Sequence, residues 1–221
     1  TPLKTPLKDI EVIGNVLKTK YGFELINLKN PTQRNITDKL FEIEKMLTKN
    51  DSLLIYFAGH GKVKNKNDGY WIPKDGHKED EGTWISNDYI RNKLKSIKAN
   101  NILVIADSCY SGTLGMRGGK VDDKEQKSQN YYLNTKSRIA ITSGANQPVL
   151  DGGGGDHSIF ARLLINKLKN NNKAMSTSQL HGSISNEVRE ITEKLNVKQT
   201  PVRIPLYAAG HVAPDFVFIP K

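Results

Sequence analysis

The spacing of apolar residues changes along the chain between a helical and a strand-like period, and this alternation predicts the elements of the fold. Thr5 followed by proline is a helix-start signal and predicts a first helix over residues 6–21. Thr32 and Ser86 are candidate caps of later helices. The predicted helices carry apolar stripes at Ile10, Ile13, Val16 and Leu17; Ile36, Leu40, Ile43 and Leu47; Ile90, Leu94 and Ile97; Phe160, Leu163, Leu164 and Leu168; and Leu180, Ile184, Val188, Ile191 and Leu195.

Two short runs, residues 52–57 and residues 101–106, are almost continuously apolar. Such runs are typical of strands that are buried on both faces of a parallel sheet. Because strands and helices alternate, the sequence predicts an α/β fold with a mainly parallel sheet and helices on both faces. Further strands are predicted at residues 23–28, 69–73, 138–142 and 216–219.

The length of 221 residues favours a single domain over residues 1–221. Within it, residues 115–137 combine Gly, Lys, Asp, Gln and Ser with few apolar residues. We expect a mobile loop there.

The composition excludes several classes of protein. Apolar residues make up 37% of the chain, but no run approaches the roughly 18 residues that cross a bilayer, so we expect no membrane association. Charged residues of both signs make up 25%, and the aromatic content of 7% argues against a wholly disordered chain. The net charge of +10 raises the question of nucleic acid as a partner. The lysines are scattered, however, and no basic motif is interleaved with aromatic residues, so nucleic acid is not the expected partner.

The chain has one cysteine, Cys109, which excludes an intramolecular disulfide and a multi-thiolate zinc site. A single thiol fits a reducing compartment. The N-terminus has no apolar signal core, so we expect a cytoplasmic protein unless a segment upstream has been removed.

The two strongly apolar runs each lead into a residue that can perform chemistry, His60 after the first and Cys109 after the second. Reactive groups in an open parallel sheet gather beyond the carboxyl ends of the strands. If the two strands are neighbours, the imidazole faces the thiol, takes its proton and later returns it to a leaving amine. The backbone N–H groups of Gly61 and Cys109 are then candidates for an oxyanion hole.

Each of these residues also has a simpler interpretation. A lone cysteine at a strand end is often an inert core thiol, and a histidine between glycines can be only a turn residue. Their conjunction favours catalysis, because each follows an apolar strand and is followed by glycine. The other histidines show no metal-ligand spacing and are expected at the surface or in the core: His77, His157, His181 and His211.

The segments Tyr56-Phe57-Ala58-Gly59-His60-Gly61 and Asp107-Ser108-Cys109-Tyr110-Ser111-Gly112 resemble the histidine and cysteine motifs of caspase-like cysteine peptidases, most closely the metacaspase and prokaryotic orthocaspase branch. The 49 positions from His60 to Cys109 are close to the roughly 50 of caspases. The resemblance implies a caspase-like three-layer sandwich and a cysteine endopeptidase that requires no cofactor. Caspase-like domains begin with a central strand before the first helix. That strand is missing here, so we expect the natural protein to extend N-terminally, with a regulatory domain there or in a partner.

The resemblance also implies a substrate pocket. Metacaspases carry an aspartate two residues before the nucleophile and cleave after Arg or Lys, and Asp107 has that position here. A carboxylate beside the scissile bond attracts a cationic side chain and repels an acidic one. The family's second pocket aspartate corresponds to Asp9, and Asp151 is a candidate at the rim. The alternatives are a turn cap for Asp107 and an ordinary first-turn acidic residue for Asp9. Animal caspases have Gln-Ala-Cys where this chain has Asp-Ser-Cys, which argues against cleavage after Asp.

Many metacaspases need calcium, and Asp75, Asn87 and Asp88 fall where that family places oxygen ligands. A further family aspartate, a few residues after the nucleophile, is replaced by Leu114-Gly115-Met116. We therefore expect no calcium requirement, with calcium kept as a candidate ligand.

The predicted mobile loop contains basic residues that the enzyme's expected specificity would recognise. Exposed flexible segments are where proteolysis concentrates. Self-cleavage in residues 115–137 is therefore one expectation, and an ordinary surface loop is the alternative. The basic residues are Arg117, Lys120, Lys124, Lys127 and Lys136.

The sequence thus predicts a cysteine endopeptidase that cuts protein substrates after exposed Arg or Lys residues. Two other classes stay open: a catalytically silent scaffold that keeps the fold for protein interaction, and a basic nucleic-acid-binding domain. The intact pair of His60 and Cys109 argues against the first, and the scattered lysines argue against the second.

Overall fold

The computed structural model is built around a four-stranded sheet with the order β1-β5-β6-β10. Strands β1 (Ser52–Ala58), β5 (Asn101–Asp107) and β6 (Ser137–Thr142) are parallel, and β10 (Val202–Pro205) pairs with β6 in the antiparallel direction. Strand β10 is short and contains arginine and proline, so the apolar pattern did not predict it. The structure describes residues 2–64, 68–108, 113–114, 135–144, 153–212 and 215–221.

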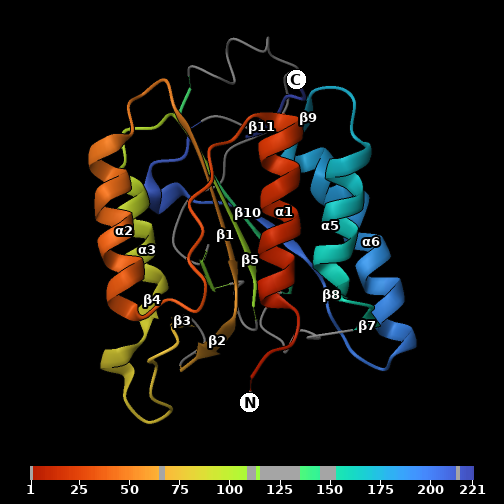
Figure 1. Ribbon diagram of the computed structural model, residues 1–221, viewed down its shortest axis with the longest axis horizontal. Coiled ribbons are helices and arrows are strands. Elements are labelled where there is room, and N and C mark those ends of the chain that lie inside the picture. Colours follow the sequence, from red (N-terminus) through yellow and green to blue (C-terminus); the bar gives the residue numbers. More distant parts are fainter. Residues whose placement is uncertain (1, 65–67, 109–112, 115–134, 145–152, 213–214) are drawn as a thin grey trace.

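Helices cover both faces of the sheet (Figure 1). Helices α1 (Pro6–Tyr21), α5 (Ile159–Asn170) and α6 (Thr177–Lys194) lie on one face, and α2 (Gln33–Met46) and α3 (Asn87–Ser96) lie on the other. The predicted three-layer α/β sandwich and its five apolar helices are confirmed. None of the helices in the described residues is long and apolar enough to span a membrane.

Helices α2 and α3 begin where the sequence supplies a capping side chain, whereas α1 begins at Pro6 without a side-chain cap from Thr5. Thr32 accepts a hydrogen bond from the Asn35 N–H at 3.1 Å, and Ser86 accepts one from the Tyr89 N–H, also at 3.1 Å. Helix α1 ends at Gly22, whose φ of 75° is a left-handed conformation that glycine adopts without strain.

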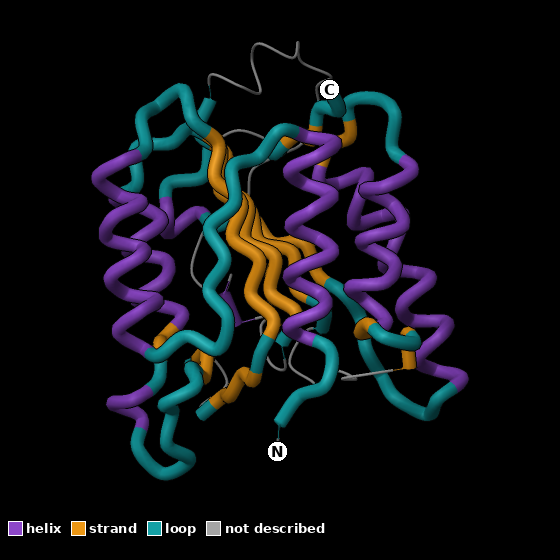
Figure 2. Tube along the Cα trace, in the orientation of Figure 1, coloured by secondary structure: helices purple, strands orange, loops and turns teal. Residues whose placement is uncertain are grey.

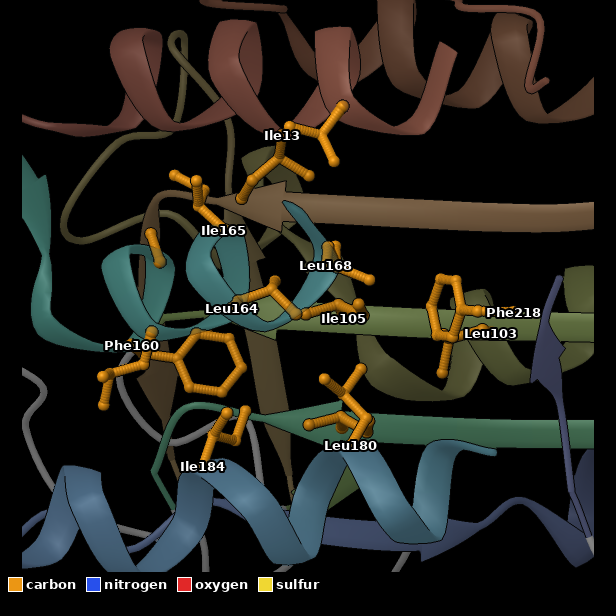
Figure 3. Close-up of a cluster of buried hydrophobic side chains, with 14 of the residues drawn as sticks. Ile13, Leu103, Ile105, Phe160, Leu164, Ile165, Leu168, Leu180, Ile184 and Phe218 are labelled. Carbon is orange, nitrogen blue, oxygen red and sulfur yellow. The ribbon is translucent and has the colours of Figure 1, made fainter. Parts of the chain in front are cut away.

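Two buried apolar clusters hold the layers together. Strand β5 contributes residues to both clusters, because its alternate side chains point to opposite faces of the sheet. Leu103 and Ile105 pack with α1, α5 and α6 (Figure 3), and Ile102 and Val104 pack with α2 and α3. All seven residues of β5 are buried, which explains its continuously apolar sequence.

The edge of the sheet at β1 differs from the prediction. Its side chains pack against the apolar clusters on both faces, as expected, but within the described residues β1 pairs only with β5, so one edge is open and the strand is half-buried. The strand predicted at residues 23–28 does not form either. This segment runs as a loop beside the sheet (Figure 2), with Leu25 39% and Ile26 50% exposed. The segment pairs with no strand in the described residues, so its apolar residues alone did not produce a strand.

Three short strands form a second sheet, which the sequence predicted only in part. β3 (Gly69–Ile72) was expected as an extended segment, but β2 (His60–Val63) and β4 (Ile85–Ser86) were not. The closing strand forms as β11 (Val217–Phe218), which pairs with β9 (Met175–Ser176) outside the main sheet.

Arg138 on β6 is a large, fully buried polar side chain. It is 1% exposed, and its guanidinium donates to main-chain carbonyls. Burial lowers the pKa of Arg138 to about 10, so it stays charged at neutral pH. The carbonyls belong to the end of α3 and the segment after it, groups that a helix end leaves without intrahelical partners. They are those of Leu94 at 3.3 Å, Ile97 at 3.1 Å, Asn100 at 2.6 Å and also Ser137 at 3.2 Å.

We predict that Arg138→Met lowers the free energy of unfolding by about 3 kcal/mol or more, because it leaves buried carbonyls unpaired. Urea denaturation of the two proteins measures this difference. The control is Arg34→Met, at a side chain that is 88% exposed, which should change stability by less than about 0.5 kcal/mol. Equal stability of the two variants would contradict the prediction.

Candidate active site

The parallel pairing of β1 with β5 sets the frame of the candidate site. Ala58, the last residue of β1, lies opposite Asp107, the last residue of β5. The Gly59 N–H donates to the Asp107 carbonyl at 3.3 Å, which continues the pairing beyond the strand end. The expectation that the two strands are neighbours is therefore confirmed. His60 lies two residues after Ala58, and Cys109 lies two residues after Asp107. Cys109 itself lies outside the described residues.

His60 opens the small second sheet, near the lower end of the main sheet in Figure 1. Its side chain is exposed, and its backbone lies opposite Ile72 of β3. The neighbouring Gly61 lies opposite Trp71, whose ring stacks on Phe57 of β1 at 4.2 Å and 3°. This stacking joins the histidine-bearing sheet to the end of β1.

Asp107 is 7% exposed and lies among hydroxyl groups. Ser158 donates its Oγ hydrogen to Asp107 Oδ2 at 2.5 Å, and the Tyr56 hydroxyl donates to the same oxygen at 3.5 Å. Burial raises the pKa of Asp107 to about 6, the hydrogen bond from Ser158 opposes this shift, and the negative charge of Asp9 adds to it. Burial and the Asp107 charge raise the pKa of Tyr56 well above its ordinary value, so its hydroxyl keeps the proton it donates.

Asp9 reaches the same place from the first turn of α1. It is 1% exposed, and its Oδ1 lies 2.6 Å from His157 Nδ1. The Ser158 N–H donates to Asp9 Oδ2 at 3.5 Å. Burial raises the pKa of Asp9, against the lowering effect of its hydrogen bond with His157. Asp9 is therefore a buried carboxylate, and Ser158 touches both it and Asp107.

These contacts join five residues, which we call the acidic cluster: Asp9, Tyr56, Asp107, His157 and Ser158. Sequence reasoning missed three of them. Tyr56 was hidden in an apolar strand, and His157 was assigned to the surface or core. Ser158 caps α5 by accepting from the Ala161 N–H at 2.9 Å, a role that its place before an apolar helix could have predicted. Its contact with both aspartates needed the tertiary structure.

The three predicted calcium ligands have separate partners. Asp75 accepts a hydrogen bond from the Gln33 N–H at 2.8 Å, Asn87 donates to Thr113 Oγ1 at 2.7 Å, and Asp88 forms an ion pair with Arg91. No group of three or more His, Cys, Asp and Glu side chains in the described ranges could hold a metal ion. No step of the chemistry is assigned to calcium.

Two other predictions concern residues that the structure does not describe. Asp151 lies outside the described residues, as do residues 115–134 of the predicted loop. Of the basic residues named for self-cleavage, Lys136 is described and is exposed.

A mainly parallel α/β sheet between two helical layers, with a histidine just beyond one strand and a buried carboxylate at the end of its neighbour, is a caspase-like architecture. The family model of the caspase domain matches residues 1–204, and the chain belongs to this family of cysteine peptidases.

Solved structures share the fold. A protein of Geobacter sulfurreducens, a structural genomics target, is 20% identical with a TM-score of 0.65, over 96% of this chain and 86% of that one. Caspase-1 from Spodoptera frugiperda is 15% identical with a TM-score of 0.66, over 93% of this chain and 80% of that one. A search of curated protein sequences gave no significant match.

We predict that Asp107→Asn stabilises the protein at pH 8. The folded state holds the Asp107 proton up to a pH of about 6, whereas the unfolded chain loses it near 3.8. Stability from this group is therefore present below about pH 4, falls as the pH rises to about 6 and does not return above it. The substitution should recover up to about 3 kcal/mol at pH 8 and almost nothing at pH 4.

Urea denaturation at the two pH values measures this. Asp156→Asn, at a side chain that is 75% exposed, is the matched control and should change stability little at either pH. An Asp107→Asn variant that is less stable than the wild type at pH 8 would overturn the interpretation of Asp107 as an unfavourably buried carboxylate.

Proposed function

We propose that the protein is a cysteine endopeptidase that hydrolyses protein substrates after Arg or Lys, with Cys109 as nucleophile and His60 as general base and acid. The observation that carries the proposal is the β1–β5 register. It aligns Ala58, the last residue of β1, with Asp107, the last residue of β5. His60 and Cys109 each come two residues after the end of one of these adjacent parallel strands. Adjacent strands lie only about 5 Å apart, within reach of a thiol and an imidazole.

The proposed reaction has two stages. The Cys109 thiol gives its proton to His60, and the sulfur attacks the scissile carbonyl carbon. The backbone N–H groups of Gly61 and Cys109 stabilise the oxyanion. The C–N bond then breaks, and His60 protonates the leaving amine. In the second stage water gives a proton to His60 and attacks the thioester, which releases the carboxylic acid and restores the thiol.

The acidic cluster supports the choice of substrate. Asp107 is buried, its pKa is raised, and no Lys or Arg in the described part of the chain pairs with it. Asp9 pairs with the imidazole of His157, and no Lys or Arg in the described part of the chain pairs with it. A guanidinium or ammonium group entering from a substrate would supply the charge that these carboxylates lack. An acidic side chain would meet repulsion at the same place.

The proposal predicts cleavage of fluorogenic peptides that end in Arg or Lys, and no cleavage of the peptide that ends in Asp. Cys109→Ala and His60→Gln should reduce turnover to background. Asp107→Asn should lower kcat/KM for the Arg peptide by about 100-fold or more, because it removes a buried charge partner. Release of the fluorophore, with calcium and with chelator, measures all three effects.

The outcomes separate the alternatives. Cysteine-dependent cleavage after Asp would keep the nucleophile and overturn the assignment of the pocket. A folded wild type that cleaves no peptide with or without calcium would favour the interaction scaffold.

Self-cleavage between residues 115 and 137 is a further prediction of the same specificity. Intact mass spectrometry of purified wild type should show fragments with new C-termini at Arg or Lys in this range. Cys109→Ala, the control, should stay a single chain. A wild type that stays intact while it digests the Arg peptide to completion would refute self-cleavage.

A further inference from the structure

Arg91 of helix α3 is buried and holds the chain just beyond the nucleophile segment. The residue is 5% exposed, and its Nη1 donates to the main-chain carbonyls of Thr113 at 3.2 Å and Leu114 at 3.0 Å. Its Nη2 pairs with Asp88, whose side chain is 50% exposed. A buried guanidinium is costly unless its charge and donors are satisfied. Here its N–H groups donate hydrogen bonds to the backbone of a segment that begins four residues after Cys109.

A second contact holds the same segment. Asn87, 2% exposed, donates its side-chain N–H to Thr113 Oγ1 at 2.7 Å. Gly69 of β3 faces this pair so closely that an added Cβ would lie 1.9 Å from Thr113 Oγ1 and 2.4 Å from Asn87 Nδ2. The packing therefore requires glycine at position 69. We call Asn87, Arg91 and Thr113, with the Leu114 carbonyl, the α3 clamp.

The α3 clamp connects the two halves of the proposed dyad. Helix α3 directly follows β4, which pairs with β3, which in turn pairs with the His60-bearing β2. On the other side, the segment from Asp107 to Leu114 contains Cys109 and is held at both ends, by β5 pairing at Asp107 and by the clamp at Thr113.

We propose that Arg91 and Asn87 are positioning residues that fix the nucleophile segment relative to His60. The inference rests on the proposed roles of Cys109 and His60. Neither clamp residue touches the substrate. Their effect is on the mutual geometry of thiol and imidazole, to which the reaction rate is steeply sensitive, since a misplacement of about 1 Å can cost about 100-fold.

Alkylation of the thiol provides a test that does not need peptidase activity. Cys109 is the only cysteine of the chain, so iodoacetamide reports on it without background. A nearby imidazole lowers the pH at which a thiol becomes reactive, and an unassisted thiol has its midpoint near pH 8.5. We expect Arg91→Met to move the midpoint of the alkylation rate upward by about one pH unit or more. A merely structural role for Arg91 would leave this midpoint unchanged in the folded variant.

Peptide hydrolysis gives the second readout. Arg91→Met should lower kcat by about tenfold or more while KM changes by less than about threefold, because the acidic cluster is intact. Arg91→Lys keeps the charge beside Asp88 but loses the fork of donors, so its kcat should be intermediate. Gly69→Ala removes no polar group and should still lower kcat, because its Cβ displaces Thr113 or Asn87. Arg34→Met, exposed on α2, is the control and should match the wild type.

His60→Gln separates failure of this inference from failure of the proposed function. If His60→Gln shifts the alkylation midpoint and folded Arg91→Met does not, the dyad stands and the clamp has no positioning role. If neither variant shifts it, the dyad is wrong and the inference falls with it. Should Arg91→Met not fold, as judged by circular dichroism, Arg91→Lys and Gly69→Ala decide: wild-type kcat and midpoint in both would overturn the inference.

Discussion

The parallel pairing of β1 with β5 is the constraint on which the rest of the site depends. Its register places Ala58 opposite Asp107, and both sheets and both motifs are arranged around that point. A slip of one residue would turn the side chains of β5 to the opposite faces and exchange the two apolar clusters. The complete burial of β5, with Leu103 and Ile105 on one face, therefore fixes the alignment of Ala58 with Asp107 as well as the core.

Two buried carboxylates near the strand ends destabilise the fold, and the apolar core offsets this cost. Asp9 and Asp107 are both buried, and burial raises the pKa of each. Hydrogen bonds from Ser158 and Tyr56 reduce the cost at Asp107 without removing it. Two buried carboxylates that share one serine as a neighbour are a poor arrangement for stability, and under the proposed function a cationic substrate group would compensate their charge. In contrast, the buried Arg138 binds main-chain carbonyls and completes the end of a helix.

The two halves of the proposed dyad belong to different parts of the fold. His60 lies on the small sheet of β2, β3 and β4, and Cys109 follows the main sheet. Stacking of Trp71 on Phe57 joins the two sheets on the histidine side. The α3 clamp, through Arg91, provides a second connection on the cysteine side. Both connections use buried or half-buried groups with defined geometry, which suits a site that must hold a thiol and an imidazole at a fixed separation.

The sequence by itself determined the helices, the buried strand β5 and the two motifs, because helical periodicity, continuous apolar runs and capping residues are local signals. It did not determine the loop at residues 23–28, the half-buried edge at β1 or strand β10, because strand formation depends on which partners the rest of the chain supplies. Family resemblance identified Asp9 and Asp107 as a pair. Only the tertiary structure brought Ser158 between them, because that contact joins residues about 150 and 50 positions apart in the chain.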